Sequence, residues 1–355
     1  MSRVGQICSL EIFIGLALIT LLSACFPGPS DRQDHVHDLR VLAMKMEPPE
    51  IEVPLDPAAP PVEVLSTALV VDPARGEIEL AFRGCPSPSS SACQSSPADA
   101  SDPLYQPLMA ERRERLAFPA EPGAPELLPT DLRAYPAATM NRLIEDVGFA
   151  GIAGARPALE LSVDSPTLES HYEVAFKRLQ ISYPDVFYRV ALGELGIPIC
   201  DAQGQPAGCL EYRTKVPNSN PVLTSLSWQG MREAENGEDP TPVPAEGLEV
   251  AAGTTIRIHP DIDADAVEAY QTLGIDLSTE QIVVNDYEEL LVLNWFSTAG
   301  DFSLSQTVPE RDFGAYTDWS APTEPEEMGV HWLWVVLRDN RGGVDFTRLK
   351  ITVGP

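Results

Sequence analysis

Four carboxylates lie close together in the second half of the chain, at Asp261, Asp263, Asp265 and Glu268. Carboxylate oxygens are hard ligands, and Ca²⁺ takes six to eight of them. The segment is not an EF-hand loop, because Ala266 stands at the glycine position of that motif and Thr272 stands where the bidentate glutamate belongs. We therefore expect either a calcium site of another kind, or an acidic loop in which Asp263 or Asp265 caps a short helix that runs through Tyr270.

Two tryptophans, Trp332 and Trp334, lie within the apolar segment 330–337. Residues two apart on a strand point to the same face, so both rings would lie there together with Val336. Two flat rings in a row can bind a sugar or a protein partner. Exposed apolar patches of this size are uncommon, and the alternative is that an insertion or a neighbouring domain covers the two rings.

Catalytic motifs are weak in this chain. Its histidines lie at positions 35, 37, 171, 259 and 331, and neither an HExxH nor a GxSxG motif is present. The glycine-rich segment 148–154 lacks the lysine of a phosphate-binding loop and a preceding strand, so we expect a plain loop there. His35 and His37 could bind a transition metal, or they could belong to a solvated tether. We predict no catalytic residues, and no cofactor apart from the possible calcium.

The first 25 residues have the pattern of an export signal. Arg3 precedes the apolar run 12–22, whose eleven residues are too few to span a bilayer as a helix. The run ends in Leu22-Ser23-Ala24-Cys25, which resembles the lipobox of bacterial lipoproteins. The resemblance implies that residues 1–24 are removed, that Cys25 is diacylated and that the new N-terminus is acylated. The alternative is an ordinary signal peptide or a short membrane anchor.

The residue after this cysteine is Phe26 and not aspartate. Under the usual sorting rule for such lipoproteins, this implies attachment to the outer membrane, facing either the periplasm or the cell surface. The membrane would then be a partner through the lipid anchor. Residues 25–38 are rich in proline, glycine and polar side chains, so we expect a flexible tether there.

Removal of the signal peptide and lipidation of Cys25 would leave four cysteines in the exported part. Four cysteines allow three pairings, and short spacings favour local disulfides. The expected pairs are Cys85 with Cys93 and Cys200 with Cys209. The alternative is a four-thiolate metal site, which the wide spacings and the oxidising compartment disfavour.

The balance of charge excludes one class of partner. Asp and Glu number 53 against 24 Lys and Arg, which gives a net charge of −29. So acidic a surface repels phosphate backbones, and we expect no binding of nucleic acid. The 34 prolines also disfavour a helix-rich protein and favour short strands joined by extended loops.

The distribution of tryptophan and cysteine predicts two separate cores. All five tryptophans follow position 227, and every cysteine precedes position 210. A polar boundary between prolines lies near 217–221, so we expect one domain over 39–216 and another over 218–355. In the first domain, strands surround an insertion at about 86–155 with helices at 110–116 and 137–147. The charged run 111–115 would be a solvated helix face.

Seven strand candidates follow in the second domain, at 222–228, 248–250, 254–259, 289–297, 302–307, 330–338 and 344–353. The last two form a hairpin across Asp339-Asn340-Arg341-Gly342-Gly343. This turn and the segment Val250-Ala251-Ala252-Gly253-Thr254 resemble those of PKD-like, cadherin-like and other immunoglobulin-like modules of bacterial surface proteins. We therefore predict an all-β protein with two immunoglobulin-like β-sandwich domains in tandem, the first with a partly helical, irregular insertion.

Together these features predict a non-catalytic, lipid-anchored envelope protein at the outer membrane, with a structural, adhesive or ligand-binding role and a protein or glycan partner. Two alternatives remain open at the level of sequence. One is a lipoprotein enzyme that acts on a cell-wall or extracellular polymer. The other is a subunit of a larger envelope complex.

Overall fold

The protein is described by a computed structural model over residues 33–86, 101–120, 123–147, 154–166, 172–194, 196–200, 209–276, 281–309 and 315–355. Strands dominate these residues, and the prediction of a mostly β protein with sandwiched sheets is confirmed. No helix in the described ranges is long and apolar enough to cross a membrane.

The first pair of sheets forms what we call the N-terminal sandwich, residues 39–182. One sheet contains β1 (Arg40–Glu47), β3 (Val62–Val71), β6 (Glu126–Leu127) and β7 (Thr130–Tyr135). The other has the order β5 (Arg112–Ala117), β4 (Glu77–Cys85), β8 (Ala158–Asp164) and β9 (Tyr172–Arg178). A short parallel pair joins β2 (Glu50–Glu52) to β10 (Gln180–Ser182).

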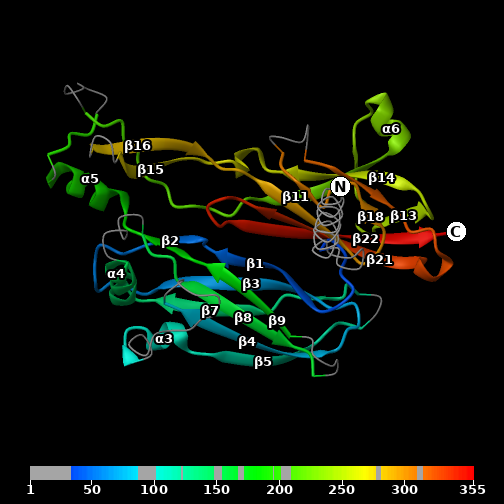
Figure 1. Cartoon of the computed structure of the whole chain (residues 1–355), viewed down its shortest axis with the longest axis horizontal. Coiled ribbons are helices and arrows are strands. Elements are labelled where there is room, and N and C mark those ends of the chain that lie inside the picture. Colours follow the sequence, from blue (N-terminus) through cyan, green and yellow to red (C-terminus); the bar gives the residue numbers. More distant parts are fainter. Residues whose placement is uncertain are drawn as a thin grey trace, which may run out of the picture.

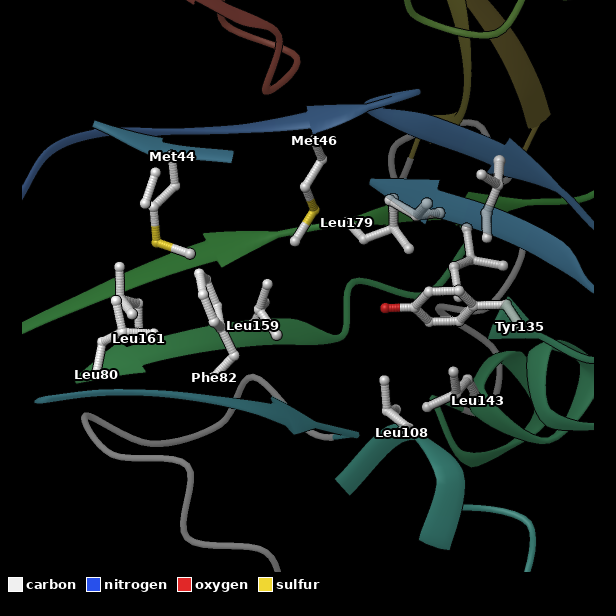
Figure 2. Close-up of a cluster of buried hydrophobic side chains, with 14 of the residues drawn as sticks. Met44, Met46, Leu80, Phe82, Leu108, Tyr135, Leu143, Leu159, Leu161 and Leu179 are labelled. Atoms are coloured by element: carbon white, nitrogen blue, oxygen red, sulfur yellow. The ribbon is translucent and has the colours of Figure 1, made fainter. Parts of the chain in front are cut away.

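Alternation of apolar and polar residues explains this packing. In β4 the side chains of Ile78, Leu80 and Phe82 are buried, and the residues between them are partly or fully exposed. Figure 2 shows Phe82 and Leu80 facing Met44 and Met46 of the opposite sheet. Burial of these side chains supplies most of the stabilisation, at roughly 25 cal/mol per Å² of apolar surface.

The second pair of sheets forms the C-terminal sandwich, residues 223–354. One sheet has the order β12 (Thr241–Pro242), β11 (Leu223–Gly230), β14 (Thr255–Ile262), β20 (Thr317–Ser320) and β18 (Asp301–Phe302). The other has the order β13 (Leu248–Ala251), β22 (Val344–Gly354), β21 (Gly329–Arg338), β17 (Val292–Ser297) and β19 (Gln306–Thr307). Trp295 and Trp319 fill the core between the two sheets.

Helical segments and one further hairpin surround the sheets in the described part of the chain. The helical segments are α3 (Gln106–Met109), α4 (Ala137–Asp146), α5 (Asp185–Glu194), α6 (Met231–Asn236), η2 (Ala264–Ala266) and η3 (Pro325–Glu327). The hairpin consists of β15 (Ala269–Asp276) and β16 (Gln281–Glu288) and leaves the C-terminal sandwich between β14 and β17. In Figure 1 it extends beside α5, at one end of the molecule.

A third apolar cluster joins the two sandwiches. Leu42 of β1 and Leu69 of β3 pack there against Trp334 and Val336 of β21. The sheet of β1 and β3 is therefore covered on both faces, by the other sheet of its own sandwich and by the C-terminal sandwich. This explains why its strands carry apolar residues on both faces. The four sheets are stacked as successive layers, as Figure 1 shows.

Two predictions about the first domain are wrong. Residues 112–117 form strand β5 and not a helix, because they pair with the free edge of β4 in a register that places Leu116 beside Ile78. The predicted insertion between strands at about 86–155 is also not the irregular segment expected, since its described residues include β5, β6 and β7 of the two sheets. The predicted helix at 137–147 is confirmed as α4.

The described end of the expected tether is not a free linker. Residues 25–32 lie outside the described residues, but 33–38 are docked on the C-terminal sandwich. His35 forms a parallel bridge with Ser297, and the amide of Val36 donates to the carbonyl of Ser297 at 2.8 Å. Val36 is 1% exposed within the cluster between the sandwiches, and its burial fixes a segment that otherwise looks like a linker.

Candidate functional site

The four carboxylates of the predicted calcium site do not converge. Asp261 accepts hydrogen bonds from the hydroxyls of Ser225 and Ser227, and Asp263 caps η2 by accepting from the amide of Asp265 at 3.0 Å. Glu268 instead pairs with Arg341 at 2.9 Å. Nowhere in the described ranges do three or more His, Cys, Asp or Glu side chains form a group that could hold a metal ion. Asp263 thus has the predicted capping role, but the helix is the single turn η2 and does not extend to Tyr270, which lies in β15. Calcium binding has no formed site among these residues.

The predicted aromatic platform is wrong, because the N-terminal sandwich covers it. Trp334 is 1% exposed, and its indole Nε1 donates to Glu126 at 2.6 Å. Trp332 is partly exposed, with the guanidinium of Arg348 5.6 Å from its ring centroid. Trp334 is covered, as the alternative expected, by residues of the N-terminal sandwich.

One predicted disulfide is confirmed, between Cys200 and Cys209. This bond excludes both residues from the alternative four-thiolate metal site. Cys93 and the lipidation residue Cys25 lie outside the described residues, so the pairing of Cys85 with Cys93 and the modification of Cys25 stay predictions.

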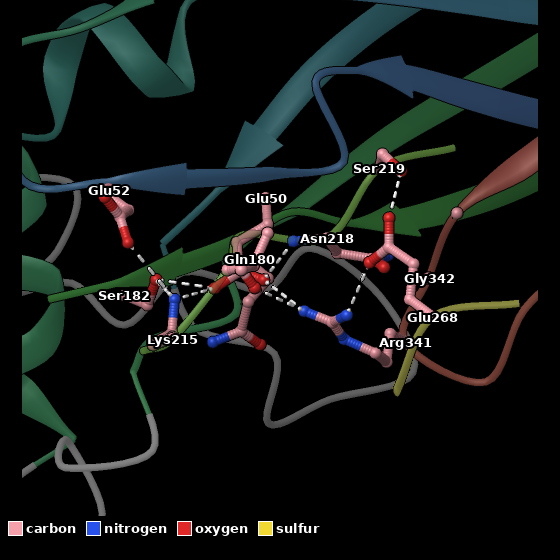
Figure 3. A network of polar contacts seen from close by, with 12 residues as sticks. Glu50, Glu52, Gln180, Ser182, Lys215, Asn218, Ser219, Glu268, Arg341 and Gly342 are labelled. Carbon is pink, nitrogen blue, oxygen red and sulfur yellow. Dashed lines mark hydrogen bonds and ion pairs between the residues drawn. The ribbon is translucent and has the colours of Figure 1, made fainter. Parts of the chain in front are cut away.

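The residues that do converge lie at the junction of the two sandwiches, around Glu50 at the start of β2. This side chain is almost fully buried, and four donors contact its two oxygens (Figure 3). The donors are Lys215 Nζ at 2.6 Å, Ser182 Oγ at 2.6 Å, the Asn218 amide at 2.8 Å and Arg341 Nη2 at 3.1 Å. A buried carboxylate needs such pairing to remain charged.

Arg341 extends this network into the C-terminal sandwich. Its Nη1 atom lies 2.9 Å from Glu268 and 3.1 Å from Glu289, while its Nη2 atom contacts Glu50. Its guanidinium also lies over the ring of Tyr270, 4.7 Å from the centroid. One cation therefore pairs with carboxylates from both sandwiches. We call the residues of these two groups of contacts the junction network: Glu50, Ser182, Lys215, Asn218, Glu268, Glu289 and Arg341.

The turn between β21 and β22 presents Arg341. The carboxylate of Asp339 accepts from the amides of Arg341, Gly342 and Gly343 at 2.8, 2.6 and 2.7 Å. Gly342 has a φ of 110°, a conformation that favours glycine. A side chain at position 343 would collide with the Asp339 carboxylate, so the local sequence fixes this turn.

Burial and neighbouring charges shift two carboxyl groups in opposite directions. Burial alone would raise the pKa of Glu50, but the Lys215 ammonium and the hydrogen bonds to the carboxylate outweigh it and hold the pKa below its usual value. For Glu289, burial together with the nearby Asp339 raises the pKa to about 7, despite Arg341.

A cleft adjoins the junction network. It consists of two neighbouring cavities of about 230 and 340 Å³, which lie between the connector 212–216, hairpin β15–β16 and the turn. The two cavities share Tyr212, Lys215, Tyr270, Gln271 and Arg341. Lys215 is paired with Glu50 and Glu52, and Arg341 with three carboxylates. Two further cations line the cleft: Arg213 pairs with Asp286, and Arg156 donates to the side chain of Gln180. The cleft also offers aromatic faces and hydrogen-bonding groups, which suit binding better than proton transfer.

Reasoning from sequence missed this junction. Glu50, Lys215 and Arg341 are separated by more than a hundred residues in each case, and no short motif connects them. The turn 339–343 was identified as a hairpin, but nothing in its sequence indicates that Arg341 reaches the other sandwich.

Comparisons with known proteins give no family. No protein-family model matches the chain, and no curated protein sequence is significantly similar. Among solved structures, red sea bream transglutaminase matches 90% of this chain at 10% identity and a TM-score of 0.22, and the match covers about a third of that enzyme (32%). The two tandem V-type regions of VCBP3, a v-region-containing chitin binding protein, match 89% of this chain and all of theirs, at 11% identity and a TM-score of 0.24. At such scores neither likeness bears on function.

Proposed function

We propose that this protein is a non-catalytic, lipid-anchored protein of the outer membrane, composed of two immunoglobulin-like domains in tandem. In this proposal the protein serves as an adhesive or ligand-binding module, and the cleft beside the junction network is its binding site.

The order of strands supports the immunoglobulin-like assignment. In such domains, strands A, B, E and D form one sheet and strands G, F and C the other, to which variable-type domains add C′. The order β11-β14-β20 fits A-B-E, and β22-β21-β17 fits G-F-C, while the two-residue edge strands β18 and β19 follow one another in the reverse of the order expected for C′ and D. In the N-terminal sandwich, β1-β3-β7 fits A-B-E and β9-β8-β4-β5 fits G-F-C-C′.

The observation that carries the proposal is the position of the cleft relative to the anchor segment. Strand β17 begins at Val292, which pairs with Arg338 next to the cleft-forming turn, and it ends at Ser297, which pairs with His35. These two ends lie roughly 17 Å apart along the strand. The chain therefore enters the described fold at the end of the C-terminal sandwich opposite to the cleft.

A lipid on Cys25 would place that entry side close to the membrane. Only seven residues separate Cys25 from position 33, and seven residues span at most about 25 Å. The short connection would orient the cleft and hairpin β15–β16 away from the bilayer. This orientation suits capture of a ligand or a partner from outside the membrane.

The paired charges of the cleft favour binding over catalysis. A lipoprotein enzyme would need a nucleophile with a base, or two free carboxyl groups, next to a bound substrate. In the described part of the cleft, the carboxylate of Glu50 and the cations of Lys215 and Arg341 already hold one another.

Exposed apolar side chains on α5 support a second candidate, a subunit of an envelope complex. Val186, Phe187 and Val190 are 44%, 39% and 56% exposed and lie on one side of the helix. A protein partner could cover this stripe, which lies at the same end of the molecule as hairpin β15–β16 (Figure 1).

Labelling and fractionation test the anchor. Cells that express the full chain are grown with an alkynyl fatty acid, and membranes are separated from soluble protein. We expect the label and the protein in the outer-membrane fraction, and loss of the label in Cys25→Ala. The matched control is Cys8→Ala, which alters a cysteine inside the removed segment and should have no effect on the mature protein. Label that persists in Cys25→Ala would refute the proposal.

A further inference from the structure

A second site lies where the two sandwiches meet, on the other side of the turn 339–343 from the cleft. It is a cavity of about 250 Å³ between residues 41–44 of β1, residues 175–177 of β9 and the end of β21 with the turn that follows. Its volume falls just below the range of about 300–1,000 Å³ that is usual for drug-sized ligands. The cavity therefore has room for a small molecule only.

Two cations line this cavity, and their partners are all neutral. Lys177 donates to the carbonyl of Gly342. Arg338 donates to the side chain of Asn294 at 3.1 Å and to the carbonyl of Leu42 at 2.8 Å. In the described residues, neither forms an ion pair with a carboxylate. This contrasts with Lys215 and Arg341 of the junction network, which both do.

The one carboxylate in the lining, Asp339, is engaged elsewhere. It is buried, and one of its oxygens accepts from three amides of its own turn. The other accepts from the side-chain amide of Asn218 at 3.3 Å. The lining thus carries two positive charges and one negative charge, within a chain whose net charge is −29.

A buried charge without an oppositely charged partner is unfavourable, and here burial shifts the pKa of both cations. Burial lowers the pKa of Lys177 to about 8, with Arg338 lowering it further and Asp339 opposing the shift. Burial also lowers the pKa of Arg338. A single anion in the cavity would balance the surplus positive charge and give both cations, whose present acceptors are neutral, an anionic acceptor.

The rest of the lining is apolar and defines the other half of the ligand. Val41, Met44 and Phe176 contribute to the walls, and the Phe176 ring is 45% exposed. Met44 is already buried in the core of the N-terminal sandwich, and Val41 packs against that core. An inorganic anion would leave Phe176 exposed, whereas an apolar group attached to the anion would cover it.

We propose that this cavity binds a small carboxylate with an apolar body, its carboxylate held by Lys177 and Arg338 and its apolar part packed on Val41 and Phe176. The site is separate from the cleft beside Glu50, and it does not depend on the lipid anchor. Two sources share this chemistry: a free aromatic or aliphatic acid, and the C-terminal carboxylate of a peptide with an apolar last residue.

Calorimetric titration of the full chain in detergent tests the site. The probes are phenylacetate, its neutral analogue phenylacetamide, and a tripeptide ending in phenylalanine with a free or an amidated C-terminus. We expect saturable binding of phenylacetate in the millimolar range and none of phenylacetamide. Binding of the free but not the amidated tripeptide would identify peptide termini as ligands, whereas binding of phenylacetate alone would identify free acids. No saturable binding of either carboxylate would overturn the proposal.

Substitution separates the role of the charge from the fold. We expect Lys177→Met to weaken phenylacetate binding by about tenfold or more, as for loss of a charge-assisted hydrogen bond. The matched control is Lys350→Met, the same change on β22 away from the cavity, which should bind as the unmodified protein does. Equal affinity in Lys177→Met would overturn the proposal.

A pH series in the unmodified protein gives the same test without a mutation. Phenylacetate stays ionised between about pH 7 and pH 9, whereas Lys177, which Arg338 and Asp339 face, loses its proton across that range. Affinity should therefore fall as the pH rises. An affinity that stays constant over this range would contradict the assignment of Lys177.

Discussion

Arg341 and Glu50 are 291 residues apart in the sequence, yet their side chains form an ion pair of 3.1 Å across the junction of the two sandwiches. Glu50 is 4% exposed and Arg341 is 13% exposed in their side chains. The pair connects the turn after β21 to the start of β2. It therefore holds the two sandwiches together and fixes the position of two side chains that line the adjoining cleft.

Replacement of Arg341 should loosen this junction. In Arg341→Met, Glu50, Glu268 and Glu289 lose their shared cation while they remain partly or fully buried. Breaking a buried ion pair in this way costs about 3–5 kcal/mol of unfolding free energy. Denaturant unfolding measures the change. The control is Arg113→Met, because the Arg113 side chain is 77% exposed and its removal should leave the stability nearly unchanged. Equal effects of the two substitutions would contradict a structural role for the junction network.

The raised pKa of Glu289 predicts a dependence of stability on pH. The folded protein binds the proton of Glu289 more tightly than the unfolded chain does. The contribution of Glu289 to stability is therefore greatest below the ordinary pKa of 4.5 and declines as the pH rises to about 7. Glu289→Gln cannot lose this proton, so its stability relative to the unmodified protein should increase between pH 5 and about pH 8. Thermal unfolding across this range is the measurement. A constant difference between the two proteins would show that Glu289 does not titrate there.

The indole of Trp334 should hold the two sandwiches together. Trp334→Ala removes a fully buried ring from the cluster between the sheets and leaves Glu126 without one of its donors. Substitutions of this kind cost about 3–5 kcal/mol. Trp332→Ala is the matched control, because Trp332 is only partly buried on the same face of the same strand. If Trp332→Ala proved the more destabilising of the two, the described packing would be wrong.

The disulfide between Cys200 and Cys209 should add modest stability. The loop it closes is short, and loops of about this length are worth about 2–3 kcal/mol through restriction of the unfolded chain. The double variant Cys200→Ser with Cys209→Ser should unfold earlier by that amount. The unmodified protein should shift equally when a reductant is added, and the double variant should shift less. Detection of both thiols in the folded, unreduced protein would exclude the bond.

Prediction from sequence succeeded where a local pattern decides the structure. Alternation in 77–85 identified β4, and the composition of 137–147 identified α4. Spacing alone indicated the bond between Cys200 and Cys209. In each case the signal lies within about ten residues of chain.

Prediction failed where a distant partner decides the structure. Residues 112–117 have the composition of a helix, but the edge of β4 offers backbone hydrogen bonds that outweigh this preference. Val36 looked like part of a tether because its neighbours are polar, and only the cluster around Trp334 explains its burial. Glu268 looked like a calcium ligand, and Arg341, 73 residues later, takes the place of the ion. None of these partners can be identified from one sequence alone.

The N-terminus of the mature protein offers the most direct test of the proposed placement at the membrane. Protein extracted from outer membranes with detergent is digested, and the N-terminal peptide is identified by mass spectrometry. We predict a peptide that begins at Cys25 and carries the mass of a diacylglyceryl group and an amide-linked acyl chain. A peptide that begins at Met1, or an unmodified peptide that begins at or after Cys25, would contradict lipid anchoring and with it the orientation proposed for the cleft.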